Sequence, residues 1–127
     1  MVSVLQNVAI DCADAYELAR FWSGVTGHPL HPDDGPGVAE TQVMLPDGPF
    51  LYFNQVPEPK SSKNRLHLCL RPETSREEEV ERLLDLGATL VADRRKADGS
   101  GWAVLADPEG NEFCVLRSES DRAAAPS

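Results

Sequence analysis

The residues best suited to chemistry lie in two short alternating segments. "NRLHLCL" (64–70) places His67 two residues before Cys69, and "NEFCVLR" (111–117) places Glu112 two residues before Cys114. Alternate residues of a β-strand point to the same face of its sheet, so each pair is expected to share a face. Imidazole and carboxylate groups can transfer protons, and thiolates bind soft metals such as zinc. The two segments therefore predict a polar site on one face of a sheet.

Each of these residues also has a purely structural interpretation. A histidine can line a half-buried sheet, and cysteines commonly pack as small hydrophobic side chains. A strand glutamate is often paired with a cation, which in this sequence would be Arg65 or Arg71. The structural and the chemical interpretations both stay open at the level of the sequence.

The composition restricts the classes of partner. A chain of 127 residues fits one domain. The formal net charge of −9 and the pI near 4.7 argue against nucleic acid and anionic membranes as partners. The three cysteines form no C-x-x-C pair, and we see neither a leader peptide nor a membrane-spanning run. We therefore expect a reduced, cytoplasmic protein.

One order of elements occurs twice along the chain. In the first copy we expect a strand, a helix and a hairpin, over 7–12, 14–27, 39–45 and 49–56. In the second copy we expect a strand, a helix and three more strands, over 65–70, 75–87, 88–92, 101–106 and 111–117. Asp14 and either Thr74 or Ser75 are suitable N-caps, and Gly24 or Gly27 and then Gly87 can end the helices. The pattern predicts an α+β fold of tandem βαβββ modules whose curved mixed sheet surrounds a cavity.

The repeat also predicts the domain organisation. Residues 1–117 form one domain, with the first module over about 4–56 and the second over about 64–117. The polar segment at 57–63 is the expected linker. Residues 118–127 show no periodicity and are expected to be a disordered tail.

Alternation within the strands predicts which side chains face the cavity. Val8 and Ile10, and in the second copy Leu66, Leu68 and Leu70, should face the helices. The opposite faces combine polar groups with aromatic walls, as small-molecule pockets do. The predicted ligand-binding residues on these faces are Asn7, Asp11, Tyr52, Asn54, His67, Cys69, Trp102 and Cys114.

Three segments resemble the vicinal oxygen chelate superfamily. They are the opening "VAIDCADAYELARFW", the central "NRLHLCL" and the closing "DPEGNEFCVL". The chain is most similar to the small bacterial glyoxalase-like members, over about Val4 to Arg117. The resemblance implies the tandem βαβββ fold, and it implies a homodimer, because members often pair their modules across subunits. It does not assign one reaction, since a fold hosts many functions.

The resemblance also allows the metal site to be tested position by position. Metal-dependent members carry a His on the first strand and a Glu on the last strand of each module. The matching positions here are Asn7, Tyr52, His67 and Cys114, of which His67 alone is the expected kind of ligand. We therefore expect no standard metal site and no cofactor. A divalent metal (Zn, Mn, Ni or Fe) is the alternative, including a zinc site built from His67, Cys69 and Cys114.

Three functions compete at this point. The first is a small-molecule-binding protein for an aromatic or amphiphilic ligand, similar to the bleomycin-resistance members. The second is an enzyme of the lyase, isomerase or dioxygenase type, with His67, Glu112 and Tyr52 as catalytic residues and with or without a metal. The third is a non-catalytic dimerisation domain. Whether the protein is an enzyme stays open.

Overall fold

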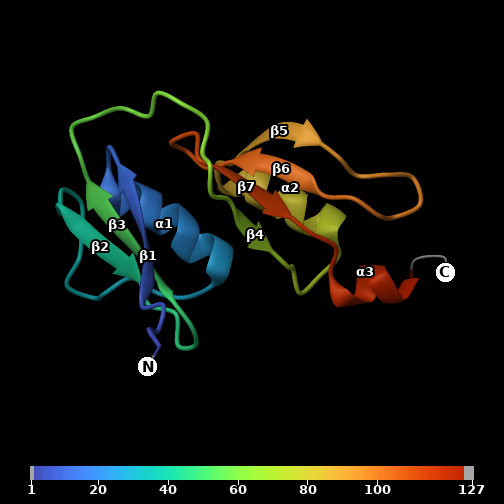
Figure 1. The fold of residues 1–127 in the computed structure, drawn as a ribbon, viewed down its shortest axis with the longest axis horizontal. Helices are drawn as coiled ribbons and strands as arrows, with labels where there is room; N and C mark the ends of the chain where they lie inside the picture. The colour runs from blue at the N-terminus through green and yellow to red at the C-terminus, as the bar shows by residue number, and fades with distance from the viewer. Residues whose placement is uncertain (1, 125–127) are drawn as a thin grey trace. The chain divides into compact units, whose positions relative to one another are not determined.

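The chain divides into two compact units, which are described separately. The computed structural model describes residues 2–124. Unit 1 is Met1–Ser61 and unit 2 is Ser62–Ser127, so the division falls inside the segment 57–63 that the sequence predicts as a linker. Figure 1 shows the order of the elements along the chain. No helix among residues 2–124 is both long enough and apolar enough to cross a membrane.

Unit 1 consists of one helix and a three-stranded mixed sheet. Its elements are β1 (Asn7–Cys12), α1 (Ala15–Thr26), β2 (Glu40–Val43) and β3 (Phe50–Gln55). The strand order is β1-β3-β2, with β1 parallel and β2 antiparallel to β3. The unit is therefore βαββ instead of the predicted βαβββ, and between α1 and β2 an isolated bridge joins Leu30 to Val43.

Unit 2 has the full βαβββ order followed by a short helix. Its elements are β4 (Leu68–Leu70), α2 (Arg76–Leu86), β5 (Thr89–Asp93), β6 (Ala103–Ala106), β7 (Glu112–Val115) and α3 (Glu119–Ala124). The strand order is β4-β7-β6-β5, with β4 parallel to β7 and the other pairs antiparallel. The α+β fold class with mixed sheets is thus confirmed, while a cavity shared by both sheets stays a prediction.

Local capping sets the ends of the two long helices. The Asp14 carboxylate accepts the Glu17 backbone N–H at 3.1 Å, and the Ser75 hydroxyl accepts the Glu78 N–H at 3.2 Å. Such N-caps satisfy donors that have no partner inside the helix. Gly27 ends α1 with a φ of 75°, a conformation that glycine adopts without a Cβ penalty. Gly87 follows α2 in the same role.

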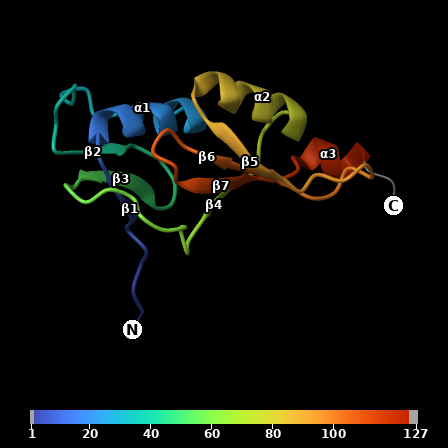
Figure 2. The ribbon, with the colours of Figure 1, turned by 90° about the horizontal axis from the view of Figure 1, so that it is seen from above.

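In each unit the helix covers one face of the sheet, as Figure 2 shows for α1 and for α2. The buried side chains alternate along the strands, as expected for a sheet with one covered face. In unit 1 the covered core includes Leu18, Trp22, Val25, Val43 and Phe53. In unit 2 it includes Val80, Leu83, Leu105, Phe113 and Val115. The opposite faces are left to the more polar side chains.

The first strand of unit 2 is shorter than predicted. The sequence predicts a strand over 65–70, but β4 begins at Leu68, and Leu66 is 88% exposed instead of facing the helix. The Asn64 side chain accepts the Glu112 backbone N–H at 3.3 Å. The backbone N–H of Glu112, at the start of β7, is thus bound by a side chain instead of by a backbone carbonyl of β4. The residues before Leu68 lie outside the hydrogen-bonded pairing of β4 with β7.

The C-terminal prediction is wrong for residues 119–124, which form α3 instead of a disordered tail. Ser118 is buried, and its hydroxyl accepts the Asp121 N–H at 3.0 Å. The Asp121 carboxylate accepts the N–H groups of Ser118 and Arg76, and these hydrogen bonds, that of Ser118 first, lower the pKa of Asp121. A reciprocal cap therefore starts this helix. The rest of the predicted tail, 125–127, lies outside the described residues.

A buried arginine anchors the segment between β5 and β6. The Arg76 guanidinium donates to the carbonyl groups of Ser100 and Gly101 at 3.2 and 2.9 Å, and it pairs with Glu77 at 2.9 Å. Gly101 has a φ of 90°, and a Cβ at this position would collide with the Arg94 carbonyl. The chain entering β6 is thus bound by Arg76 and packed closely against the backbone of Arg94.

We expect Gly101→Ala to lower the free energy of unfolding by roughly 3 kcal/mol or more, because it combines positive-φ strain with a backbone clash. Gly37→Ala is the matched control, since Gly37 has a φ of 91° and open space around its Cβ position. That variant should lose about 1 kcal/mol from the conformation alone. Denaturant unfolding of both variants measures the difference, and equal losses would contradict the clash.

Candidate ligand-binding pocket

Strand register brings a row of four residues together on the open face of the unit 2 sheet. Cys69 of β4 is the partner of Cys114 of β7, Cys114 is the partner of Val104 of β6, and Val104 is the partner of Ala92 of β5. A register shift between Leu90 and Ala92 sets the position of Ala92. The row runs across the whole sheet and forms the floor of a hollow.

Neighbouring residues extend this floor on both sides. Arg94 and Trp102 exchange backbone hydrogen bonds just beyond the ends of β5 and β6, at 2.9 and 3.4 Å. Glu112 lies two residues before Cys114, on the same face. The hollow has a volume of about 410 Å³, and Lys63, His67 and Leu116 complete its lining. This volume lies in the range of small-molecule pockets.

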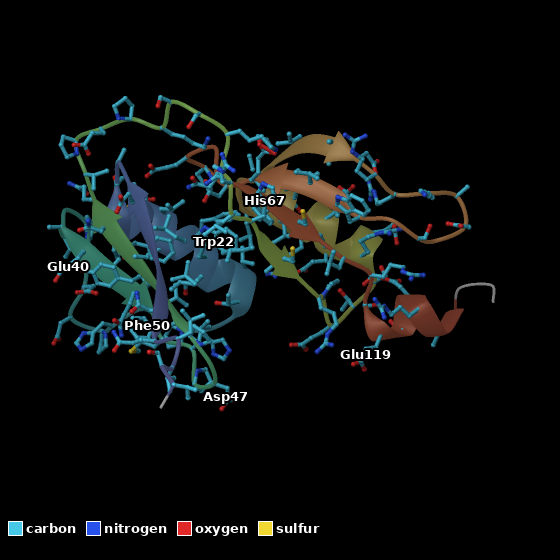
Figure 3. The ribbon with its side chains drawn as sticks, in the orientation of Figure 1. Trp22, Glu40, Asp47, Phe50, His67 and Glu119 are labelled. Carbon is cyan, nitrogen blue, oxygen red and sulfur yellow. The ribbon has the colours of Figure 1, made fainter. Side chains whose placement is uncertain are left out.

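The hollow combines an apolar wall with a polar end. Trp102 is 43% exposed and stands beside Val104 and Leu116 in the lining. His67 is exposed, and Figure 3 shows it beside the unit 2 sheet. Of the predicted site residues, His67, Cys69, Trp102, Glu112 and Cys114 are therefore brought together in unit 2.

Glu112 is held by a cation that the sequence interpretation did not name. Lys63 Nζ lies 3.0 and 3.3 Å from the two Glu112 carboxylate oxygens. The Glu112 side chain is 17% exposed and that of Lys63 is 67% exposed. Arg71, one of the two expected partners, instead lies 3.7 Å from Glu119. Glu112 is therefore paired with a cation, but with Lys63 of the predicted linker instead of Arg71.

The two thiols of the hollow are free and adjacent. Cys69 is exposed and Cys114 is half-buried. Burial raises the pKa of the Cys114 thiol, and Cys69 raises it further through its charge and through a hydrogen bond between the two thiols. Cys114 is therefore more strongly protonated at neutral pH than an ordinary cysteine.

The remaining predicted site residues lie in unit 1. Register pairs Asp11 with Asn54 across β1 and β3, and Asn54 Nδ2 donates to the Asp11 carboxylate at 3.5 Å. Asn7, at the start of β1, is the partner of Phe50. In Figure 3, Phe50 and Glu40 mark the starts of β3 and β2.

Tyr52 is also in unit 1, and it has a charged partner there. Its hydroxyl donates to the Glu40 carboxylate, and this hydrogen bond is the main cause that raises the pKa of Tyr52. The phenol is therefore held in its protonated form. A single site that combines these unit 1 residues with the hollow of unit 2 stays a prediction.

Of the four positions that the superfamily implies for metal ligands, His67 and Cys114 line the hollow of unit 2. Among residues 2–124, no group of three His, Cys, Asp or Glu side chains is placed to hold a metal. The zinc site considered from His67, Cys69 and Cys114 is therefore not assembled in this part of the chain. We assign no chemical step to a metal, and the cofactor question stays open.

Val104 is expected on the same face as Trp102 from strand alternation, and sequence reasoning missed the other four residues of the lining. Leu116 follows the alternation of the predicted strand 111–117, so the two-residue period could have found it. Ala92 and Arg94 come after the register shift that follows Leu90, which a strict two-residue period does not predict. Lys63 lies in the predicted linker, where no periodicity assigns a face. Its position depends on the contact with Glu112.

The chain is an α+β protein with mixed sheets and a pocket on the open sheet face of unit 2. The family model of the glyoxalase-like domain matches residues 7–116, and the chain belongs to this family. The predicted membership in the vicinal oxygen chelate superfamily is thereby confirmed. A search of the curated proteins finds no match.

Solved structures share the fold at low sequence identity. A glyoxalase/bleomycin resistance protein/dioxygenase family enzyme from Burkholderia phytofirmans has a TM-score of 0.66 at 21% identity, covering 89% of this chain and 97% of its own. The fosfomycin resistance protein FosX from Mesorhizobium loti has a TM-score of 0.69 at 16% identity, covering 98% and 99%. A FosX mutant from Listeria monocytogenes, in complex with Mn(II) and a dihydroxypropylphosphonic acid, has a TM-score of 0.68 at 16% identity, covering 98% of each chain.

The exposure and the pKa of the thiols predict an order of alkylation. Iodoacetamide should label Cys69 first, Cys114 more slowly, and the 3%-exposed Cys12 last. Because the pKa of Cys114 is raised, its labelling should increase with pH at a higher midpoint than that of an ordinary cysteine. Initial rates from peptide mass spectrometry over a pH series measure this, with the urea-unfolded chain as the control. A Cys114 midpoint at or below that of the unfolded chain would contradict the prediction.

Proposed function

We propose that the protein binds a small aromatic or amphiphilic molecule in the hollow of unit 2. The observation that carries the proposal is the composition of one lining: an indole wall at Trp102, beside Arg94, and a polar end at His67 and the Lys63–Glu112 pair. Apolar surface with a few convergent polar groups is the usual composition of a ligand site.

The energetics of Trp102 support this proposal. The indole is 43% exposed, so a ligand that covers it would remove apolar surface from water. Aromatic ligands would add a stacking contribution of about 0.5–1.5 kcal/mol. The polar end, at His67 and the Lys63–Glu112 pair, would orient a ligand that carries a polar or acidic group. An amphiphilic molecule fits both ends.

A fluorescent aromatic amphiphile, anilinonaphthalene sulfonate, provides a direct test. We expect saturable binding to the native protein and a loss of roughly tenfold in affinity in Trp102→Ala, which corresponds to about 1.4 kcal/mol. Leu86→Ala removes a comparably exposed apolar side chain from α2, outside the hollow, and is the matched control. Equal binding by both variants would place the probe elsewhere. A thermal-shift screen of aromatic and amphiphilic compounds then extends the test to natural ligands, because a ligand of the native state raises the melting temperature.

An enzyme of the lyase, isomerase or dioxygenase type is the second candidate. It is supported by His67 and Glu112 lining the same hollow, where they could serve as base and acid. Tyr52 is the third proposed catalytic residue, and its place in unit 1 requires the two units to share a site.

Metal analysis tests the metal-dependent version of the enzyme, whereas an acid–base enzyme without a metal would survive a negative result. Under the binding proposal, purified protein should contain well below one Zn, Mn, Ni or Fe per chain, and His67→Ala should not change this content. A stoichiometric metal that is lost in His67→Ala would instead favour the metal-dependent enzyme. His67→Asn, which keeps a polar side chain at this position, controls for altered packing.

A non-catalytic dimerisation domain is the third candidate. It would be favoured if the open sheet face were filled by its own side chains, and the hollow of about 410 Å³ argues against this for unit 2. A cytoplasmic homodimer remains part of our proposal. Light scattering of the purified protein tests the oligomeric state.

A further inference from the structure

Two cysteines of unit 2 are register partners on neighbouring strands. Cys69 of β4 lies opposite Cys114 of β7, and both side chains line the same hollow. Neighbouring strands are about 4.8 Å apart. A disulfide requires Cα atoms about 4.4–6.8 Å apart and side chains that point to the same side. The register of Cys69 and Cys114 thus gives a strand spacing that falls inside the range for a disulfide.

The surroundings of the two thiols differ in a way that suits a two-step oxidation. Cys69 is exposed, so a dissolved oxidant can reach its sulfur. Cys114 is half-buried and is its cross-strand neighbour. Cys12, in unit 1, is 3% exposed and is protected from the same oxidant. An exposed attacking thiol next to a resolving thiol is the arrangement of a redox-sensitive pair.

We propose that Cys69 and Cys114 are an oxidative modification site, at which a hydroperoxide converts the dithiol into an intramolecular disulfide. The inference is independent of the proposed function, because it needs no ligand in the hollow. Thiol oxidation is not named in the description of the glyoxalase-like family or of the related structures.

The reaction proceeds in two balanced steps. The Cys69 thiolate attacks a peroxide oxygen, so that an S–O bond forms, the O–O bond breaks and an alcohol or water leaves. Cys114 sulfur then attacks Cys69 sulfur, so that the S–S bond forms and the S–O bond breaks. The departing hydroxide takes the Cys114 proton and leaves as water. Two electrons pass from the sulfurs to the peroxide, and thiol reductants reverse the change.

The disulfide would alter both the strand and the hollow. Strand β4 is an edge strand of three residues that pairs with β7. A covalent bond at its central residue would fix this edge. It would also replace two free thiols in the floor of the hollow by a rigid bridge.

Hydrogen peroxide titration of the native full-length chain tests the proposal. We expect the thiol count in denaturant to fall from three to one, the intact mass to fall by about 2 Da, and the protein to gain no intermolecular cross-link. Trypsin cleaves after Lys and Arg but not before Pro, so the two cysteines fall in the peptides 66–76 and 97–117. These peptides should be linked before reduction and separate after it.

Single variants show which of the three cysteines the disulfide requires. Cys69→Ser and Cys114→Ser should both abolish the linked peptides, whereas Cys12→Ser should leave them unchanged. The mapping in the unmodified chain does not depend on the stability of any variant. Oxidation of Cys69 to a sulfinic acid while Cys114 keeps its thiol would overturn the proposal. So would cross-linked dimers, or three unreacted thiols in excess peroxide.

Discussion

Each sheet of this protein is covered by a single helix on one face, and this constraint determines where every candidate functional residue lies. In β7, Phe113 and Val115 must enter the core against α2, so Glu112 and Cys114 are directed to the opposite face. A shift of one residue would exchange the two sets and place a carboxylate in the core. The packing of Phe113 and Val115 therefore stabilises the fold and also fixes the chemistry of the hollow.

The wall of the hollow depends on a second interaction, the buried Arg76. Its guanidinium binds the carbonyl groups that immediately precede Trp102, and its backbone N–H binds Asp121 of α3. An arginine can satisfy several acceptors at once through its planar fork of donors. One residue at the first turn of α2 thus connects the segment entering β6 with the last helix of the unit. The orientation of Trp102 depends on a contact that is remote from it in sequence.

Sequence periodicity predicts the features that depend on local geometry, such as helix caps and strand faces. It does not predict the features that depend on contacts between residues distant in sequence. The caps at Asp14 and Ser75, and the shared face of His67, Cys69, Glu112 and Cys114, follow from spacing alone. Leu66 fits the same alternation but is exposed, because the chain there is not paired with β7. The Asn64 side chain binds the Glu112 backbone N–H in place of a strand carbonyl. The cap of α3 uses an aspartate where the usual box has Glu or Gln, so the helix was not recognised. No sequence pattern predicts the position of Lys63, because its ion pair with Glu112 forms only in the folded chain.

The partners of the candidate acid–base groups bear on the choice between binding and catalysis. Tyr52 donates to Glu40 and keeps its proton, which makes it a poor base at neutral pH. The pair of Lys63 and Glu112 is different, because its cation is largely exposed and such pairs contribute at most about 1 kcal/mol. A ligand carrying an acidic group could therefore draw Lys63 away from Glu112 at little cost. The polar end of the hollow is adaptable while its Trp102 wall is held in place, and this combination suits recognition of an amphiphilic molecule.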